Sequence, residues 1–220
     1  MAWGRLTYVG PWLDTRAHTA RLLEYLQNPA AHADWQIEGG TQCPGAPFIL
    51  PMSGLVGYGY ADSFNFGERH QGLDIFGPDG LGATPVVAAY DGYLTRLPDW
   101  VSTVIIRIPQ DPLDPTRQIW TYYTHLADPA GNSYIDSAFP PGTTDVPVTA
   151  GTLLGYQGNY SGDPANPVGL HLHFSIVRDD GQGHFLNELN IANTLDPSPY
   201  LGVPANRAAD WSEPPQCAPQ

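Results

Sequence analysis

The middle of this chain consists of short runs rich in Val, Ile, Thr and Tyr, separated by turns rich in Gly and Pro. These runs span residues 85–90, 93–96, 102–108, 118–123 and 170–177. The 24 glycines and 23 prolines among 220 residues are typical of a chain with many turns, and the ordinary apolar fraction of 42% argues against disorder. The pattern predicts one mainly β domain, in which residues 102–108 and 118–123 pair as a hairpin.

The sequence divides into three regions: residues 1–45, 46–178 and 179–220. The first is an appendage whose single amphipathic helix carries Leu22, Leu23 and Leu26 on one face, and we expect it to pack on the main domain. The second holds the strand-like runs and a long loop, residues 128–147. The third is predicted to be loops and tail, with a helical turn around residues 186–189.

The charge of the chain excludes several classes of partner. All nine basic residues are arginines, and the formal net charge is −13. Such a chain is not expected to bind nucleic acid or an anionic membrane surface, since both require basic patches. No stretch reaches the ~18 apolar residues of a membrane span, and no signal peptide is visible at the N-terminus. We have no physical account of the absence of Lys.

The two cysteines, Cys43 and Cys217, lie near opposite ends of the chain. They are either two unrelated thiols or a disulfide that ties the tail back to the main domain. The tail around Cys217 is polar and rich in Pro, which is a poor setting for a buried thiol, and we therefore favour the disulfide. A disulfide implies an oxidising compartment. Closing so long a loop would stabilise the fold by about 4–5 kcal/mol on the chain-entropy model.

Two stretches have the spacing of metal ligands. His70 and Asp74 are four positions apart in a Gly-rich segment that opposes a helix, and on an extended chain these positions point to the same face. His171 and His173 are two positions apart, which on a strand also places both imidazoles on one face. A third histidine, His125, follows the aromatic run at 118–123.

Together these residue types favour a catalytic zinc site. Such a site uses three protein ligands from imidazole and carboxylate groups and keeps one position for water. One His and Asp74 from the first stretch and one His from the second would supply them. The remaining His and His125 would then serve proton transfer. Each pattern alone is weak, because surface His pairs are common, and the alternative is a set of unrelated histidines.

The sequence around these residues resembles that of a known family, the lysostaphin/LytM-type zinc metallopeptidases or M23 peptidases. The similar segments are residues 69–75, 82–92, 123–126, 155–162 and 171–174, in the order of the family's motifs. The resemblance covers roughly residues 50–178. It implies an antiparallel β-sheet core of the LytM-like, barrel-sandwich hybrid type, with a groove over one Zn²⁺ per chain.

The resemblance also implies a role for individual residues. It assigns the metal ligands to His70, Asp74 and His173, and it assigns the catalytic pair to His125 and His171. A Tyr near the metal often assists in the family, and here the candidates are Tyr58 and Tyr60. Ser175 stands where family members often carry an acidic or amide residue.

The implied function is a secreted or cell-envelope endopeptidase that hydrolyses peptide bonds in peptidoglycan stem peptides or cross-bridges. Two alternatives stay open: a non-catalytic module that binds wall or a partner protein through the same groove, and an amidase that cuts the sugar–peptide bond. We also hypothesise that residues 1–45 or the Cys217 tail partly cover the site. The cut bond and the oligomeric state are not determined by the sequence.

Overall fold

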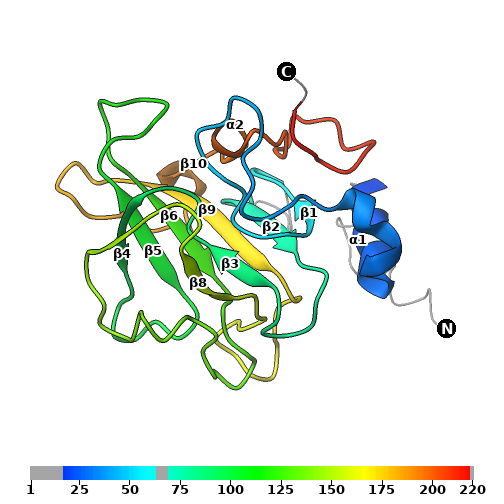
Figure 1. Ribbon diagram of the computed structural model, residues 1–220, viewed down its shortest axis with the longest axis horizontal. Helices are drawn as coiled ribbons and strands as arrows, with labels where there is room; N and C mark the ends of the chain where they lie inside the picture. The colour runs from blue at the N-terminus through cyan, green and yellow to red at the C-terminus, as the bar shows by residue number, and fades with distance from the viewer. Residues whose placement is uncertain (1–16, 63–68, 219–220) are drawn as a thin grey trace.

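The computed structural model describes residues 17–62 and 69–218 (Figure 1). Its helices are α1 (Ala17–Gln27), η2 (Pro29–Trp35), η3 (Ile191–Asn193) and α2 (Ser198–Leu201), of which η2 and η3 are 3₁₀ helices. Its strands are β1 (Leu55–Tyr58), β2 (Leu73–Phe76), β3 (Pro85–Val87), β4 (Gly92–Thr95), β5 (Val104–Ile108), β6 (Ile119–Thr124), β7 (Val146–Val148), β8 (Leu153–Tyr156), β9 (Leu172–Arg178) and β10 (Thr194–Leu195).

Most strands join one antiparallel sheet, in the order β1-β2-β9-β6-β5-β4-β7, and β10 pairs with β9. A separate two-stranded sheet consists of β3 and β8. The predicted mainly β fold is therefore confirmed. The predicted hairpin is also confirmed, because β5 and β6 pair antiparallel from Val104↔Tyr123 to Ile108↔Ile119.

The side chains of the main sheet alternate between a buried core and a second face. On β9, Leu172, Phe174 and Ile176 belong to the core cluster, which also includes residues of the β3–β8 sheet. His173 and Ser175 lie between them in sequence, so their side chains point to the opposite face. The apolar side chains of this central strand thus pack in the core, and the polar side chains of His173 and Ser175 lie on the other face of the sheet.

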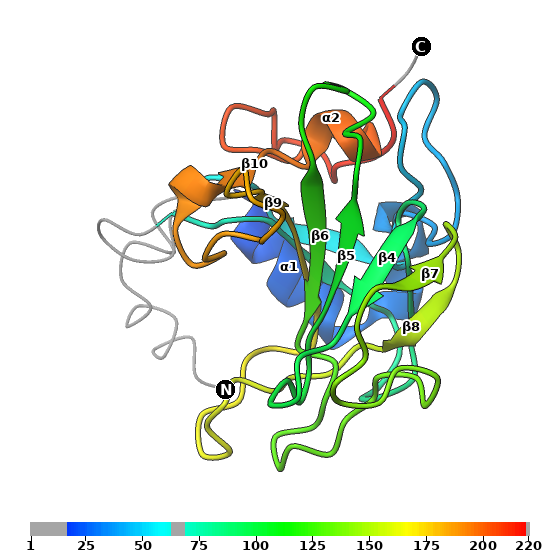
Figure 2. The same ribbon diagram turned by 90° about the vertical axis from the view of Figure 1, so that its left-hand side faces the viewer.

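Helix α1 lies beyond β1, at the edge of the main sheet (Figures 1 and 2). Leu22 and Tyr25 on one side of the helix are buried with Tyr58 and Phe76. Gly57 permits this approach, because a Cβ atom there would lie 2.6 Å from the Phe76 ring and 3.1 Å from a Leu22 methyl group. The predicted helix is present and packs on the main domain, but its predicted apolar face was wrong in part: Leu22 and Tyr25 are buried, whereas Leu26 is 44% exposed.

The C-terminal region contains more regular structure than the sequence predicted. It folds as η3, β10 and α2, whereas the helical turn expected around residues 186–189 is a non-helical turn at Glu188 and Leu189. The predicted disulfide is present between Cys43 and Cys217, with an S–S distance of 2.01 Å. Across residues 17–62 and 69–218, no helix has the length and apolar character required to span a membrane.

Candidate metal centre

The register of the main sheet brings distant segments of the chain together. Asp74 on β2 and His173 on β9 are direct cross-strand partners. On the other side of β9, His173 is the partner of Thr124, so that His125 follows immediately at the end of β6. His171 lies just before β9, two positions from His173. Strand β9 is therefore the centre of the site, with candidate residues on both neighbouring strands.

Gly72 allows the segment that carries His70 to approach β9 closely. A Cβ atom at this position would lie 2.2 Å from the carbonyl oxygen of Phe174 and 2.8 Å from the Cβ atom of Ser175. Because real Cβ atoms do not approach so closely, any other residue would push the segment away from β9. The side chains of His70 and Asp74 can therefore occupy their observed positions only because residue 72 is a glycine.

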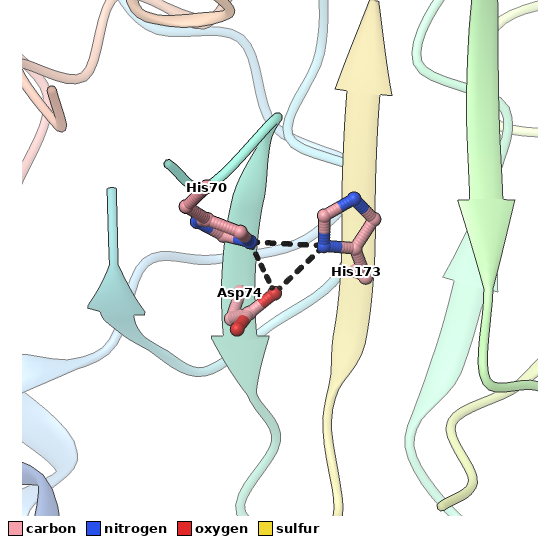
Figure 3. Close-up of side chains that lie close together, drawn as sticks. All are labelled: His70, Asp74 and His173. Atoms are coloured by element: carbon pink, nitrogen blue, oxygen red, sulfur yellow. Dashed lines mark hydrogen bonds and ion pairs between the residues drawn. The ribbon is translucent and has the colours of Figure 1, made fainter. Parts of the chain in front are cut away.

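Three side-chain atoms meet on the polar face of the sheet (Figure 3). His70 Nε2 lies 3.0 Å from Asp74 Oδ1, His173 Nδ1 lies 2.9 Å from the same oxygen, and the two nitrogens are 3.0 Å apart. All three residues are buried. The ligand atoms of tetrahedral zinc lie about 3.3 Å apart, given bonds of about 2.0–2.1 Å to nitrogen and oxygen. The donor set of two imidazoles and one carboxylate, and its spacing, therefore fit a zinc ion.

Backbone carbonyl groups fix the orientation of three histidines. Each places its Nδ1 atom against a carbonyl oxygen: His70 with Gly59 at 2.9 Å, His171 with Gly169 at 2.7 Å, and His125 with Tyr160 at 2.7 Å. A carbonyl oxygen can only accept, so in the neutral ring the proton is on Nδ1 and the lone pair is on Nε2. Each ring therefore presents the unprotonated nitrogen that metal binding or proton acceptance requires.

His173 is oriented by a residue that the sequence analysis did not identify. Its Nε2 atom lies 2.9 Å from Oε1 of Glu188, in the turn that follows β9. Burial opposes the charged ring, but the two carboxylates Glu188 and Asp74 outweigh it and raise the pKa of His173 to about 10. No local spacing rule links these two positions, so this contact cannot be predicted from a pattern in the sequence.

His125 and His171 lie side by side next to the three-residue cluster. Their ring centroids are 4.7 Å apart, and His171 Nε2 is 3.5 Å from Asp74 Oδ1. Burial lowers the pKa of both rings, in the case of His125 to about 3, with a further contribution from the neighbouring histidines. His125 also has a left-handed backbone, with φ of 74°, an uncommon conformation that costs free energy and clusters at functional sites.

A cleft of about 710 Å³ opens over these side chains. All five predicted metal and catalytic residues line it, and so does Tyr58. Tyr60 is not among the lining residues, because its hydroxyl group points to the carbonyl oxygens of Ile191 and Thr194 at 3.5 and 3.4 Å. The structure thus brings six of the seven predicted site residues to one cleft and directs Tyr60 elsewhere.

Comparisons with known proteins give matches among solved structures only. No family model and no curated protein matches the chain. Helicobacter pylori Csd3 is 17% identical with a TM-score of 0.42, over 75% of this chain and 34% of that chain. A putative peptidase M23 from Pseudomonas aeruginosa is 21% identical with a TM-score of 0.38, over 83% and 61%.

The catalytic domain of the M23 protein EnpA from Enterococcus faecalis is 22% identical with a TM-score of 0.37, over 68% of this chain and 95% of that domain. The chain spans about a third of the length of the Csd3 chain that it matches. At these identities and TM-scores, the likenesses do not establish a family or an activity.

Proposed function

We propose that this protein is a zinc-dependent peptide hydrolase of the M23 type. The observation that carries the proposal is the orientation of the four histidines that line the cleft. Three are fixed through Nδ1 by carbonyl groups, the fourth is held through Nε2 by Glu188, and each turns its other nitrogen toward Asp74 or the cleft. Surface or purely structural histidines have no reason to share this arrangement.

His70, Asp74 and His173 would hold the ion, with Nε2, a carboxylate oxygen and Nδ1 as the respective ligand atoms. When bound, zinc would acidify an attacking water and polarise the scissile carbonyl group. Glu188 would keep the ring of His173 in place through the second nitrogen, in the manner of carboxylate–histidine–zinc arrangements.

His125 and His171 would move the proton. Both rings are neutral over the physiological range because burial lowers their pKa, so their Nε2 atoms can accept a proton from water. Water adds to the carbonyl carbon, the C–N bond breaks, and the proton passes to the departing amine. The protonated ring would also stabilise the negative charge that develops on the carbonyl oxygen.

We propose peptides of peptidoglycan as the substrate, in the stem or the cross-bridge, and a secreted or cell-envelope location. The location is supported by the Cys43–Cys217 disulfide, since disulfides persist in oxidising compartments. The substrate is supported by the sequence motifs around the five site residues.

The test is digestion of purified peptidoglycan with and without a chelator, followed by mass analysis of the fragments. We expect new peptide ends that appear only when zinc is present. Release of whole stem peptides from the glycan would instead identify an amidase. His184→Ala is a suitable control variant, because this histidine is exposed and pairs with Asp180 outside the cleft.

The alternative of a non-catalytic binding module makes a different prediction for the same assay. A protein that binds one zinc ion per chain and cuts no wall preparation, yet co-sediments with peptidoglycan, would overturn the hydrolase proposal.

A further inference from the structure

Two leucines from opposite ends of the chain are exposed at the cleft over the candidate metal centre. Leu26 of α1 is 44% exposed and Leu189 is 76% exposed, and both line the cleft. Neither belongs to a buried core cluster of the described residues. Ligand sites are typically concave and lined mainly by apolar side chains with a few polar groups, which is the character of this cleft.

Both leucines are carried by segments that are fixed in place. The turn at 188–189 is held by Glu188, which contacts His173, and by the carbonyl oxygen of Leu189, which accepts a hydrogen bond from the Gln71 side chain at 3.0 Å. Gln71 directly follows His70, so Leu189 is tied to two candidate metal ligands. Its exposure is therefore a consequence of a defined position and not of a loose loop.

Helix α1 is held on its other side. Leu22 and Tyr25 are buried against the sheet, and Arg21 donates to the backbone carbonyl oxygens of Trp211 and Ser212 in the tail. Leu23, on the same face as Leu26, lines the cleft as well. Helix α1 thus provides one apolar wall, beside the aromatic rings of Tyr58 and Phe76, which also line the cleft.

The charges of the cleft complement an uncharged occupant. Among the described residues that line it, none is an arginine, and the chain has no Lys. The lining acids are Asp74 and Glu188, and both are engaged by His173. An acidic side chain beside the leucines would therefore find no arginine or lysine partner in the lining, and it would be repelled by a chain of net charge −13.

We infer that this cleft contains a subsite for a large, uncharged apolar side chain of a peptide, next to the bond that is cut, with Leu23, Leu26 and Leu189 as its walls. The inference rests on the proposed hydrolase and widens its substrate class. A polypeptide with Leu or Phe at this position would fill the subsite.

The test measures binding separately from cleavage. Fluorescent Gly-rich peptides that differ at one position, Leu, Ala or Glu, are titrated into zinc-loaded protein of the His125→Asn variant. This variant retains the left-handed backbone at position 125 and is expected to bind without turnover. The Leu peptide should bind about tenfold more tightly than the Ala peptide, the scale of selectivity that a few methylene groups give in an apolar pocket. The Glu peptide should bind most weakly.

Leu26→Ser and Leu189→Ser, each placed in the His125→Asn background, should reduce the preference for Leu over Ala, and Leu26→Met should retain it. Leu113→Ser is the matched control, because Leu113 is 48% exposed and does not line the cleft. Equal affinity for the Leu and Ala peptides, or an unchanged preference in both Ser variants, would overturn the subsite.

Cleavage of the same peptides by the zinc-loaded protein with His125 intact separates the two proposals. Selective binding without any cleavage would support the subsite and contradict the hydrolase. Cleavage at equal kcat/KM for the Leu and Ala peptides would support the hydrolase and contradict the subsite.

Discussion

Glu188 Oε1 lies 2.9 Å from Nε2 of His173, and the opposite ring nitrogen of His173 lies 2.9 Å from Asp74 Oδ1. One imidazole is therefore held between two buried carboxylates that come from different parts of the chain. Burial disfavours ionisation of Glu188, but the charge of His173 outweighs it and keeps the pKa of Glu188 below its usual value. A carboxylate in this position fixes the ring and increases its strength as a ligand.

Replacement of Glu188 should weaken zinc binding without removing a ligand. We expect Glu188→Ala to reduce zinc affinity about 10–100-fold, the usual effect of losing such a partner. Glu188→Gln should be milder, because its amide oxygen can still accept from Nε2. Competition with a chromophoric chelator measures the affinity. Glu213→Gln is the control, since Glu213 is exposed and outside the cleft, and an unaltered affinity in Glu188→Ala would contradict the role.

Zinc binding should release a proton from His173. The raised pKa, about 10, means that the metal-free ring is protonated at neutral pH and must lose its Nδ1 proton to bind metal. Asp74 is already ionised, because the surrounding histidines outweigh its burial and hold its pKa well below the usual value. Affinity should therefore rise about tenfold per pH unit between roughly pH 7 and 9.

Calorimetric titration of zinc in two buffers with different ionisation enthalpies counts the protons. About one proton should leave per zinc bound near pH 7.5. A count near zero would mean that His173 is already neutral, and would contradict the assigned contacts with the two carboxylates.

The His125→Asn variant should keep the backbone conformation at position 125 and remove the side chain's ability to accept a proton. Asn accepts the left-handed backbone, φ of 74°, that this position requires, so the fold should be retained. Asn cannot take up a proton, and turnover should fall by about 10²–10⁴-fold, the contribution typical of a general base. Zinc content and the melting temperature should stay unchanged. Substantial turnover by this variant would indicate that His171, and not His125, is the general base.

Gly72→Ala should damage the site and the fold together. The added Cβ atom would meet the Phe174 carbonyl oxygen at 2.2 Å, and moving the segment away from β9 should cost about 1–3 kcal/mol or more. Denaturant unfolding and zinc affinity should both report the loss. Gly80→Ala is a matched control, because a Cβ atom there meets nothing within 4 Å, and we expect it to be neutral.

Loss of the disulfide should destabilise the protein and loosen the tail that holds α1. Cys43 and Cys217 are 174 positions apart, a loop for which the chain-entropy model gives about 4–5 kcal/mol, or about 10 °C in the melting temperature. Thermal melts with and without a reductant measure the effect. The double variant Cys43→Ser/Cys217→Ser should melt like the reduced protein and should not respond to the reductant.

The sequence by itself predicted the mainly β fold, favoured the disulfide and proposed the residues of the candidate centre. Alternation along 170–177 assigns His171 and His173 to one face of a strand, and this pattern depends only on the local geometry of an extended chain. Such motifs can be recognised from sequence alone, because each one spans only a few consecutive residues.

The tertiary structure alone decided which residues surround the centre. Glu188 reaches His173 only because the chain turns back after β9, and its contact replaces the helical turn that local sequence favoured. Tyr58 lines the cleft, whereas the hydroxyl group of Tyr60 points to the backbone carbonyl oxygen of Ile191. Leu26 meets the cleft because α1 packs beyond β1. These contacts join positions far apart in sequence, and their free energies depend on the packing of the whole chain, which no local pattern records.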